Sequence, residues 1–224
     1  MRTLRAGAAS RGFALALLVG LLAGCGSKTD PTAQNFAEAL RADLARRGAV
    51  CQEISKPPVT FRRERNDGKP APDSDEAIGP ALAAVGLLQC QSREEGGRYY
   101  RWTEVSCAET PQAKPYLLSA EEAGRRMDGF PGERFLIREK AYLCWARWEL
   151  ADVLKWDGPA SGMPDIPAQV AKVTYRRRLA DVAPWARDPR VQAALPALAE
   201  RLAKPEEETQ QTLAQTREGW EVLR

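Results

Sequence analysis

The fold class is decided by two stretches of sequence, YLCWARWELADVLKW at Tyr142–Trp156 and AQVAKVTYRRRL at residues 168–179. Side chains alternate across a β-strand, so apolar residues at every second position predict two long strands. The short segment between them, residues 157–167, predicts a connecting loop and an antiparallel pair. The face expected to be buried carries Tyr142, Cys144, Ala146, Trp148 and Leu150 on the first strand, and Val173, Tyr175 and Leu179 on the second.

Helical patterns flank this strand pair on both sides. Asp30-Pro31 predicts a helix start, with Asp30 as the N-cap, and Gly48 predicts its end. A second helix is expected before Gly86, with its start limited by Pro80, and a third after Asp188-Pro189, interrupted at Pro196. The inward-facing positions of the three helices are Phe36, Leu40 and Leu44; Ile78, Leu82 and Val85; and Val191, Leu195, Leu198 and Leu202.

Turn signals complete the pattern. Residues 94–97 (EEGG) predict a hairpin between residues 87–91 and 98–103, and residues 217–219 predict a terminal hairpin between 212–216 and 220–223. An edge strand is expected at residues 116–118, followed by a helix that Ser119 and Glu122 open in capping-box spacing. Residues 55–75, rich in Pro, Arg, Lys and Asp, are expected to form an exposed loop.

This order of elements predicts an α+β fold. A helix-rich part with a hairpin, residues 34–127, precedes an antiparallel sheet with a packed helix, residues 141–224, and the two are expected to join near residues 128–140. The first part resembles a winged-helix arrangement, in which the hairpin is the wing. Winged-helix proteins usually read DNA with a basic helix, but residues 76–85 (EAIGPALAAV) contain no base. The resemblance therefore implies a protein contact, not a nucleic-acid contact.

The N-terminus has the features of a targeting signal. Arg2, Arg5 and Arg11 precede the ten-residue apolar run at 13–22, which is shorter than the roughly 20 residues that span a bilayer. The following LAGC, ending at Cys25, resembles a bacterial lipobox. This resemblance implies that residues 1–24 are a lipoprotein signal peptide, that Cys25 is lipidated, and that residues 25–33 form a tether. Gly26, in place of Asp, favours the outer membrane, with the body facing the periplasm; the inner membrane and the cell surface are the other locations left open. An ordinary secretory signal and a short apolar helix are the alternatives.

Removing the signal changes the charge. Without its three arginines, the chain has 30 basic and 30 acidic residues, so its formal charge is zero. A protein that binds nucleic acid through a strong positive field is therefore not expected.

The cysteines fit an oxidising compartment. Cys51, Cys90, Cys107 and Cys144 remain after Cys25, and their spacing contains no CxxC motif of a zinc ribbon or redox site. Two disulfides are expected, with three possible connectivities. The shortest loop favours Cys90 with Cys107, which leaves Cys51 with Cys144 to tie the first helix to a central strand.

Catalysis and metal binding find little support. The chain has no histidine, which excludes Ser/His/Asp and Cys/His catalysis and histidine-ligated metals. Three acidic clusters are expected in turns or helix starts, where solvation and the helix dipole explain them. No catalytic residue, metal or cofactor is therefore predicted. The clusters are Glu94 with Glu95, Asp73 with Asp75 and Glu76, and Glu206 to Glu208.

Two kinds of side chain are candidates for surface contacts. The arginines at 62, 63 and 65 and at 176–178 are candidates for binding anionic headgroups, but a solvated loop and an exposed strand face are the favoured explanation. Trp145, Trp156 and Trp185 are the candidate contact residues because Trp145 lies opposite the apolar strand face and the other two lie near strand ends. Simple packing is the favoured alternative for all three. Trp148 is expected in the core.

The order of NFAEALRADLARRGAVC, AAVGLLQ, YLLS, the Cys144 strand, VTYRRRLADVAPWARDPRVQAALP and TREGW is similar to a family of uncharacterised bacterial envelope lipoproteins. This resemblance implies one recurring fold and assigns no catalytic residue. The sequence thus predicts a non-catalytic, membrane-anchored lipoprotein that binds or scaffolds a protein partner in the periplasm. An inhibitor or immunity lipoprotein directed at a lytic enzyme, and a carboxylate-based glycan hydrolase, are the alternatives.

Overall fold

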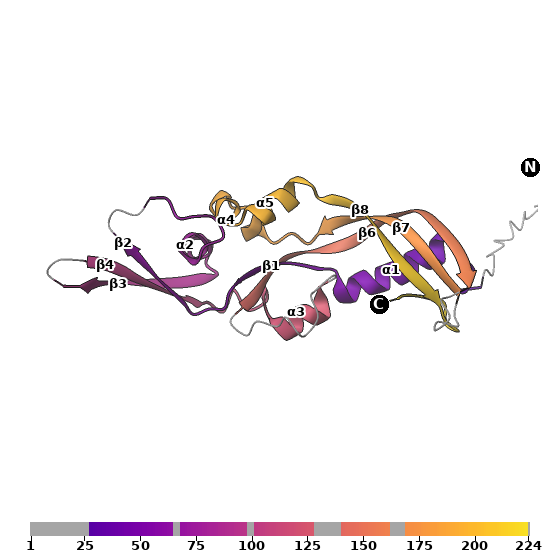
Figure 1. Ribbon diagram of the computed structural model, residues 1–224, viewed down its shortest axis with the longest axis horizontal. Helices are drawn as coiled ribbons and strands as arrows, with labels where there is room; N and C mark the ends of the chain where they lie inside the picture. The colour runs from indigo at the N-terminus through magenta and orange to yellow at the C-terminus, as the bar shows by residue number, and fades with distance from the viewer. Residues whose placement is uncertain (1–26, 65–67, 98–100, 128–139, 162–168, 224) are drawn as a thin grey trace, which may run out of the picture.

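Two antiparallel sheets lie toward opposite ends of an elongated molecule (Figure 1). The computed structural model describes residues 27–64, 68–97, 101–127, 140–161 and 169–223. Within them a six-stranded sheet has the order β1-β6-β7-β8-β9, with β5 also paired to β6, and a three-stranded sheet has the order β2-β4-β3. The α+β class is confirmed.

The predicted strand pair forms the centre of the larger sheet. β6 (Lys140–Ser161) and β7 (Gln169–Ala180) are antiparallel, with Trp148 opposite Leu179 and Trp156 opposite Val173. Pairing continues to Ser161 and Gln169, so the connection is shorter than expected. The sheet is completed by β1 (Ala49–Ser55), β5 (Leu117–Ser119), β8 (Glu206–Gln215) and β9 (Trp220–Val222).

One face of this sheet is covered by α1 (Ala33–Arg47). The predicted inward face of the helix, Phe36, Leu40 and Leu44, packs against Trp148, Val173, Tyr175, Leu213 and Trp220. The sequence placed this helix in the first part of the chain and did not predict that it covers the larger sheet. The N-cap prediction was wrong, because the Thr32 side chain, not that of Asp30, accepts from Asn35 N. The Asp30 carboxylate instead accepts from Ser27 N, closing the preceding turn.

The three-stranded sheet contains the predicted hairpin and one unpredicted strand. β3 (Leu88–Gly96) and β4 (Arg101–Glu109) form the hairpin, and β2 (Val59–Glu64) pairs with β4. The exposed-loop prediction for residues 55–75 was therefore wrong in part: Val59 and Phe61 pack on the core, while Thr60 between them is exposed. The sequence did not predict this strand because proline and arginine residues surround the two apolar positions and are typical of an exposed loop.

The helix α2 (Asp75–Ala84) packs beside this sheet and also contacts α4 (Pro189–Ala194). Ser74 caps its start, and Pro80 lies inside the helix, so the expectation that Pro80 limits the start was wrong. The winged-helix arrangement is not confirmed. The two helices expected to form it lie apart, with α1 on the six-stranded sheet and α2 beside the three-stranded one.

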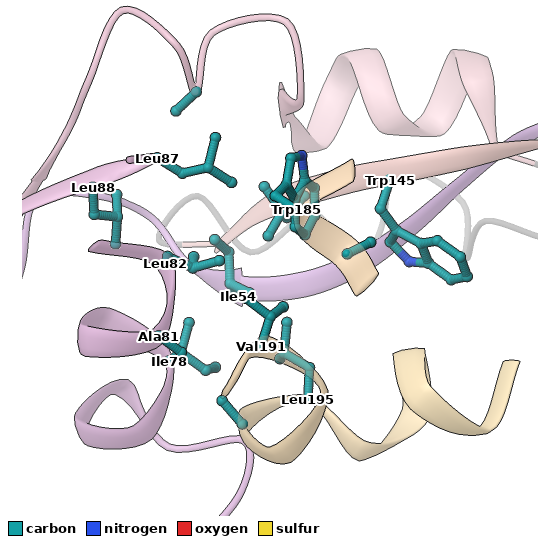
Figure 2. Packing of buried hydrophobic residues seen from close by; sticks show 14 of the residues in the cluster. Ile54, Ile78, Ala81, Leu82, Leu87, Leu88, Trp145, Trp185, Val191 and Leu195 are labelled. Carbon is teal, nitrogen blue, oxygen red and sulfur yellow. The ribbon is translucent and has the colours of Figure 1, made fainter. Parts of the chain in front are cut away.

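The main core fills the region between the two sheets (Figure 2). Ile78 and Leu82 of α2 pack in the same cluster as Val191 and Leu195 of the α4 region, with Ile54 among them. Asp188 caps α4 and Pro196 begins α5 (Pro196–Ala203), as predicted. The predicted capping box of Ser119 and Glu122 opens α3 (Ala120–Arg126).

Both favoured disulfides are present. Cys90–Cys107 joins β3 to β4, and Cys51–Cys144 joins β1 to β6, each between residues directly opposite in the register. Cys51 lies on a strand and not on the first helix, because α1 ends at Arg47. β1 and β5 precede the expected boundary near residues 128–140, and both pair with β6, which follows it. The first part of the chain therefore contributes two strands to the sheet of the second part.

Within the described residues, no helix is both long and apolar enough to cross a bilayer.

Candidate binding groove

Two adjoining hollows share Pro115 and Tyr116, and we call them together the groove. The apolar hollow, about 730 Å³, is lined mainly by Val85, Leu87, Tyr116, Pro184 and Trp185, with Gln112, Arg187 and Asp188 at polar positions. The basic hollow, about 190 Å³, is lined by Arg46, Arg126, Arg147 and Asp181 together with Trp145 and other apolar groups. The groove therefore offers an apolar surface that continues into a positively charged one.

One wall of the apolar hollow is built by a turn. Gly86 has a φ of +80°, a conformation that side chains disfavour, and it leads the chain from α2 into Leu87. The Thr110 hydroxyl donates to the carbonyl oxygens of Gly86 and Leu87, and the backbone then turns from Thr110 through Ala113 to Tyr116. Local hydrogen bonds thus fix Leu87 and Tyr116 without help from any ligand.

Trp185 also lines the apolar hollow. It lies on the 3-10 turn at Pro184–Arg187, and its ring meets that of Tyr116 edge to face at a centroid distance of 5.5 Å. Its indole N–H is buried and has no hydrogen-bond acceptor among the described residues. A buried donor without an acceptor costs about 1–3 kcal/mol, so it calls for an explanation.

The predicted exposure of two tryptophans was wrong. Trp145 is 3% exposed and Trp185 is 8% exposed, whereas Trp156 is 37% exposed. The error at Trp145 has a simple cause: both faces of the first half of β6 are covered, since Trp145 packs in the cluster between the sheets and Trp148 packs on the opposite face in the cluster of α1. Trp148 is in the core, as predicted.

The basic hollow collects arginines from three elements. Arg46 is in the last turn of α1, Arg126 is in the last turn of α3, and Arg147 is on β6. The Arg147 guanidinium donates to Asp181 and Glu149 at 2.5 Å each, and the hydrogen bond to Asp181 raises the pKa of Arg147. The hollow is lined by three guanidinium groups and one carboxylate, so the net charge of its lining favours an anion.

The carboxylate at the edge of the apolar hollow is held ionised. Asp188 accepts hydrogen bonds from the side chain and backbone of Arg190, which lower its pKa to about 2. A general acid in hydrolysis needs a raised pKa, so Asp188 is unsuited to that role.

The acidic clusters named from the sequence lie elsewhere. Glu94 and Glu95 are paired on β3 with Thr103 and Trp102, so their expected place in a turn was wrong. Asp75 and Glu76 begin α2 as expected. Glu206 to Glu208 begin β8, so their expected place in a turn or helix start was wrong. Their extended backbone follows from pairing with the arginines of β7.

The structure also shows a carboxylate pair that the sequence did not indicate. Glu109 and Glu121 line one hollow of about 770 Å³ together with Lys56 and Lys140. These residues come from separate elements and share no local motif, so no linear signal could have grouped them.

The arginine runs are largely neutralised. Arg62 stacks on Trp102 and Arg63 pairs with Glu76 at 3.0 Å, while Arg65 lies outside the described residues. On β7, Arg177 donates to Glu207 and stacks on Trp148. Arg176 and Arg178 face acidic residues on both neighbouring strands: Asp152 and Glu149 on β6, and Glu208 and Glu206 on β8. This arrangement favours the structural interpretation over headgroup binding.

Across the described part of the chain, no cluster of three or more His, Cys, Asp or Glu residues is placed to hold a metal ion. Cys25, the predicted lipidation site, lies outside the described residues. No protein-family model, curated protein or solved structure matches this chain.

Proposed function

We propose that this chain is a lipid-anchored, non-catalytic envelope protein that binds an extended segment of a protein partner in the groove. The observation that carries the proposal is the buried Trp185 indole N–H, which lacks an acceptor at the wall of an apolar hollow. A backbone carbonyl of a bound segment would supply that acceptor after a small rotation of the ring.

The lining specifies the chemistry of the segment. An apolar side chain fits against Val85, Leu87 and Trp185, where burial yields about 25 cal/mol per Å². A carboxylate near this apolar side chain in the segment would bind Arg126 and Arg46 in the basic hollow, which adjoins the apolar hollow at Tyr116. The expected partner therefore presents an apolar residue followed or preceded by an acidic one.

Anchoring explains how a shallow groove is sufficient. The lipobox ending at Cys25 supports attachment to the outer membrane with the body in the periplasm. Confinement near a membrane raises the effective concentration of a partner held at the same surface, so a modest affinity supports stable association.

Site-specific photocrosslinking in living cells tests the proposal. A photoreactive residue replaces Gln112 at the groove in one full-length variant and Thr60, an exposed position on β2, in a matched control. We expect one dominant protein adduct from position 112, absent from position 60 and reduced at least tenfold by Arg126→Glu. Equal adducts from both positions, or an adduct that Arg126→Glu leaves unchanged, would overturn it. An adduct with a lytic enzyme would identify the inhibitor alternative.

The hydrolase alternative has its own observation, the Glu109 and Glu121 pair in one hollow. Purified full-length protein is incubated with peptidoglycan, alongside Glu109→Gln and Glu121→Gln. We expect no turnover by any of the three. Turnover by the native chain that falls at least a hundredfold in either variant would establish the hydrolase and contradict our proposal.

A further inference from the structure

We propose that the end of the six-stranded sheet carrying Trp156 rests on the bilayer surface, with the Trp156 indole at the level of the lipid headgroups. This inference rests on the proposed anchoring at Cys25. It names the bilayer interface as the partner of a surface distinct from the groove.

The segment after the lipidation site is bound to the body. Gln215 donates its side-chain amide to Thr29 O at 2.8 Å, and Asn35 donates to Ser27 O at 2.8 Å and to Asp30 O at 2.9 Å. The Trp220 indole N–H donates to both Thr29 O and Asp30 O. Residues 27–30, expected to belong to a polar tether, are therefore fixed at one end of the sheet.

This docking restricts how far the body can stand from the membrane. Cys25 is two residues from Ser27, and two residues span at most about 7 Å when fully extended. A lipid on Cys25 consequently holds Ser27 within that distance of the anchored residue, which fixes the end of the molecule that faces the lipid.

Trp156 belongs to that end. Its ring contacts the ring of Phe36 at a centroid distance of 5.4 Å, and the Phe36 ring contacts that of Trp220 at 4.9 Å. The Trp220 indole N–H in turn donates to Thr29 O. Among the described residues, Trp156 is the large apolar side chain with the greatest exposure, 37%. In Figure 1 the start of α1, the C-terminal end of β6 and the N-terminal end of β7 lie together. They are at the opposite end of the molecule from β2, β3 and β4.

The chemistry of this end fits a membrane interface. Trp is enriched at headgroup level because its ring is apolar and its N–H is polar. The exposed charges nearby are mixed, with Lys28 and Arg217 beside Glu218 and Asp157, so zwitterionic lipid suffices and anionic lipid is not required. The three-stranded sheet then points away from the bilayer.

Fluorescence quenching tests this orientation on the lipidated full-length protein in phosphatidylcholine vesicles with or without brominated acyl chains. We expect brominated lipid to quench the native protein, and Trp156→Phe to remove more than half of that quenching. Trp102→Phe, which removes a tryptophan from β4 at the opposite end, should leave it unchanged. Vesicle flotation is measured on the same samples.

The outcomes separate the two proposals. Protein that floats and is quenched through Trp156 supports both. Protein that floats but whose quenching is unchanged by Trp156→Phe, or is lost in Trp102→Phe, overturns the orientation and leaves the anchor standing. Protein that fails to float overturns the anchor and the orientation together.

Discussion

Trp220 donates its indole N–H to the backbone oxygen of Thr29 at 3.1 Å across 191 positions of sequence. The contact fastens the segment that follows the predicted lipidation site to the last hairpin of the fold. Because Trp220 also packs on Phe36, the same side chain joins this segment to the core beneath α1. Anchor and body are thereby expected to move as one unit.

Removing this bond should loosen the segment, which Gln215 and Asn35 also bind. Trp220→Phe keeps the aromatic packing but removes the indole donor, so that Thr29 O keeps the Gln215 amide and Asp30 O keeps the Asn35 amide. Losing the indole hydrogen bond should cost about 1 kcal/mol of unfolding free energy. Hydrogen exchange of residues 27–32 should accelerate at least tenfold, while Trp102→Phe should not change it. Unaltered exchange in Trp220→Phe would show that the indole does not hold the segment.

The two disulfides should differ in their contribution to stability. The Cys51–Cys144 bridge closes a 93-residue separation and Cys90–Cys107 closes a 17-residue one. In the chain-entropy model, longer loops are more costly to close, so the first bridge should contribute about 1.5 kcal/mol more than the second. Urea unfolding of the double-alanine variant of each pair measures the difference. Equal losses, or a larger loss for Cys90–Cys107, would contradict the prediction.

Gly48 is expected to tolerate no side chain. A Cβ there would collide with Leu44 O and lie 2.9 Å from Trp148 O, both backbone atoms where α1 ends against β6. Gly48→Ala should therefore destabilise the fold by about 1–3 kcal/mol. Gly68 has nothing within 4 Å of the same position, so Gly68→Ala is the matched control and should change the unfolding midpoint little.

The pKa of Asp188 gives a pH prediction. Its carboxylate should titrate at about pH 2, mainly because the Arg190 side chain bonds it. A lowered pKa means that the stabilisation is fully present above the ordinary carboxyl range near 4 and is lost as the pH falls toward 2. Carbon-13 NMR should show this midpoint, and Arg190→Gln should move it upward toward 4. A native midpoint near 4 would contradict the assignment.

The strands and helices with clear periodicity were predictable from the sequence. The alternation in β6 and β7 predicted their pairing, and Ser119 and Asp188 predicted the starts of two helices. These signals are local, since a strand or helix reports its own period. Disulfide connectivity also followed, because the shortest loop lay across the predicted hairpin.

The groove could not be predicted because it depends on long-range packing. Trp145 lies on the face of β6 opposite the predicted apolar one. This face is also buried because Trp145 belongs to the same core cluster as residues of α2 and α4, which are distant in the sequence. The groove likewise brings Leu87, Tyr116 and Trp185 together from three distant segments. An alternating pattern identifies one buried face of a strand, but it cannot show whether the other face is also covered.

The most direct test of the central claim, anchoring through Cys25, is the mass of the N-terminal peptide of the protein isolated from the cell envelope. We expect a peptide that begins at Cys25 and carries a diacylglycerol thioether and an N-acyl chain, with the protein in the outer-membrane fraction. A Cys25→Ala form should lack these groups and leave that fraction. A mature native chain that begins at another residue, or that carries no lipid on Cys25, would contradict the account.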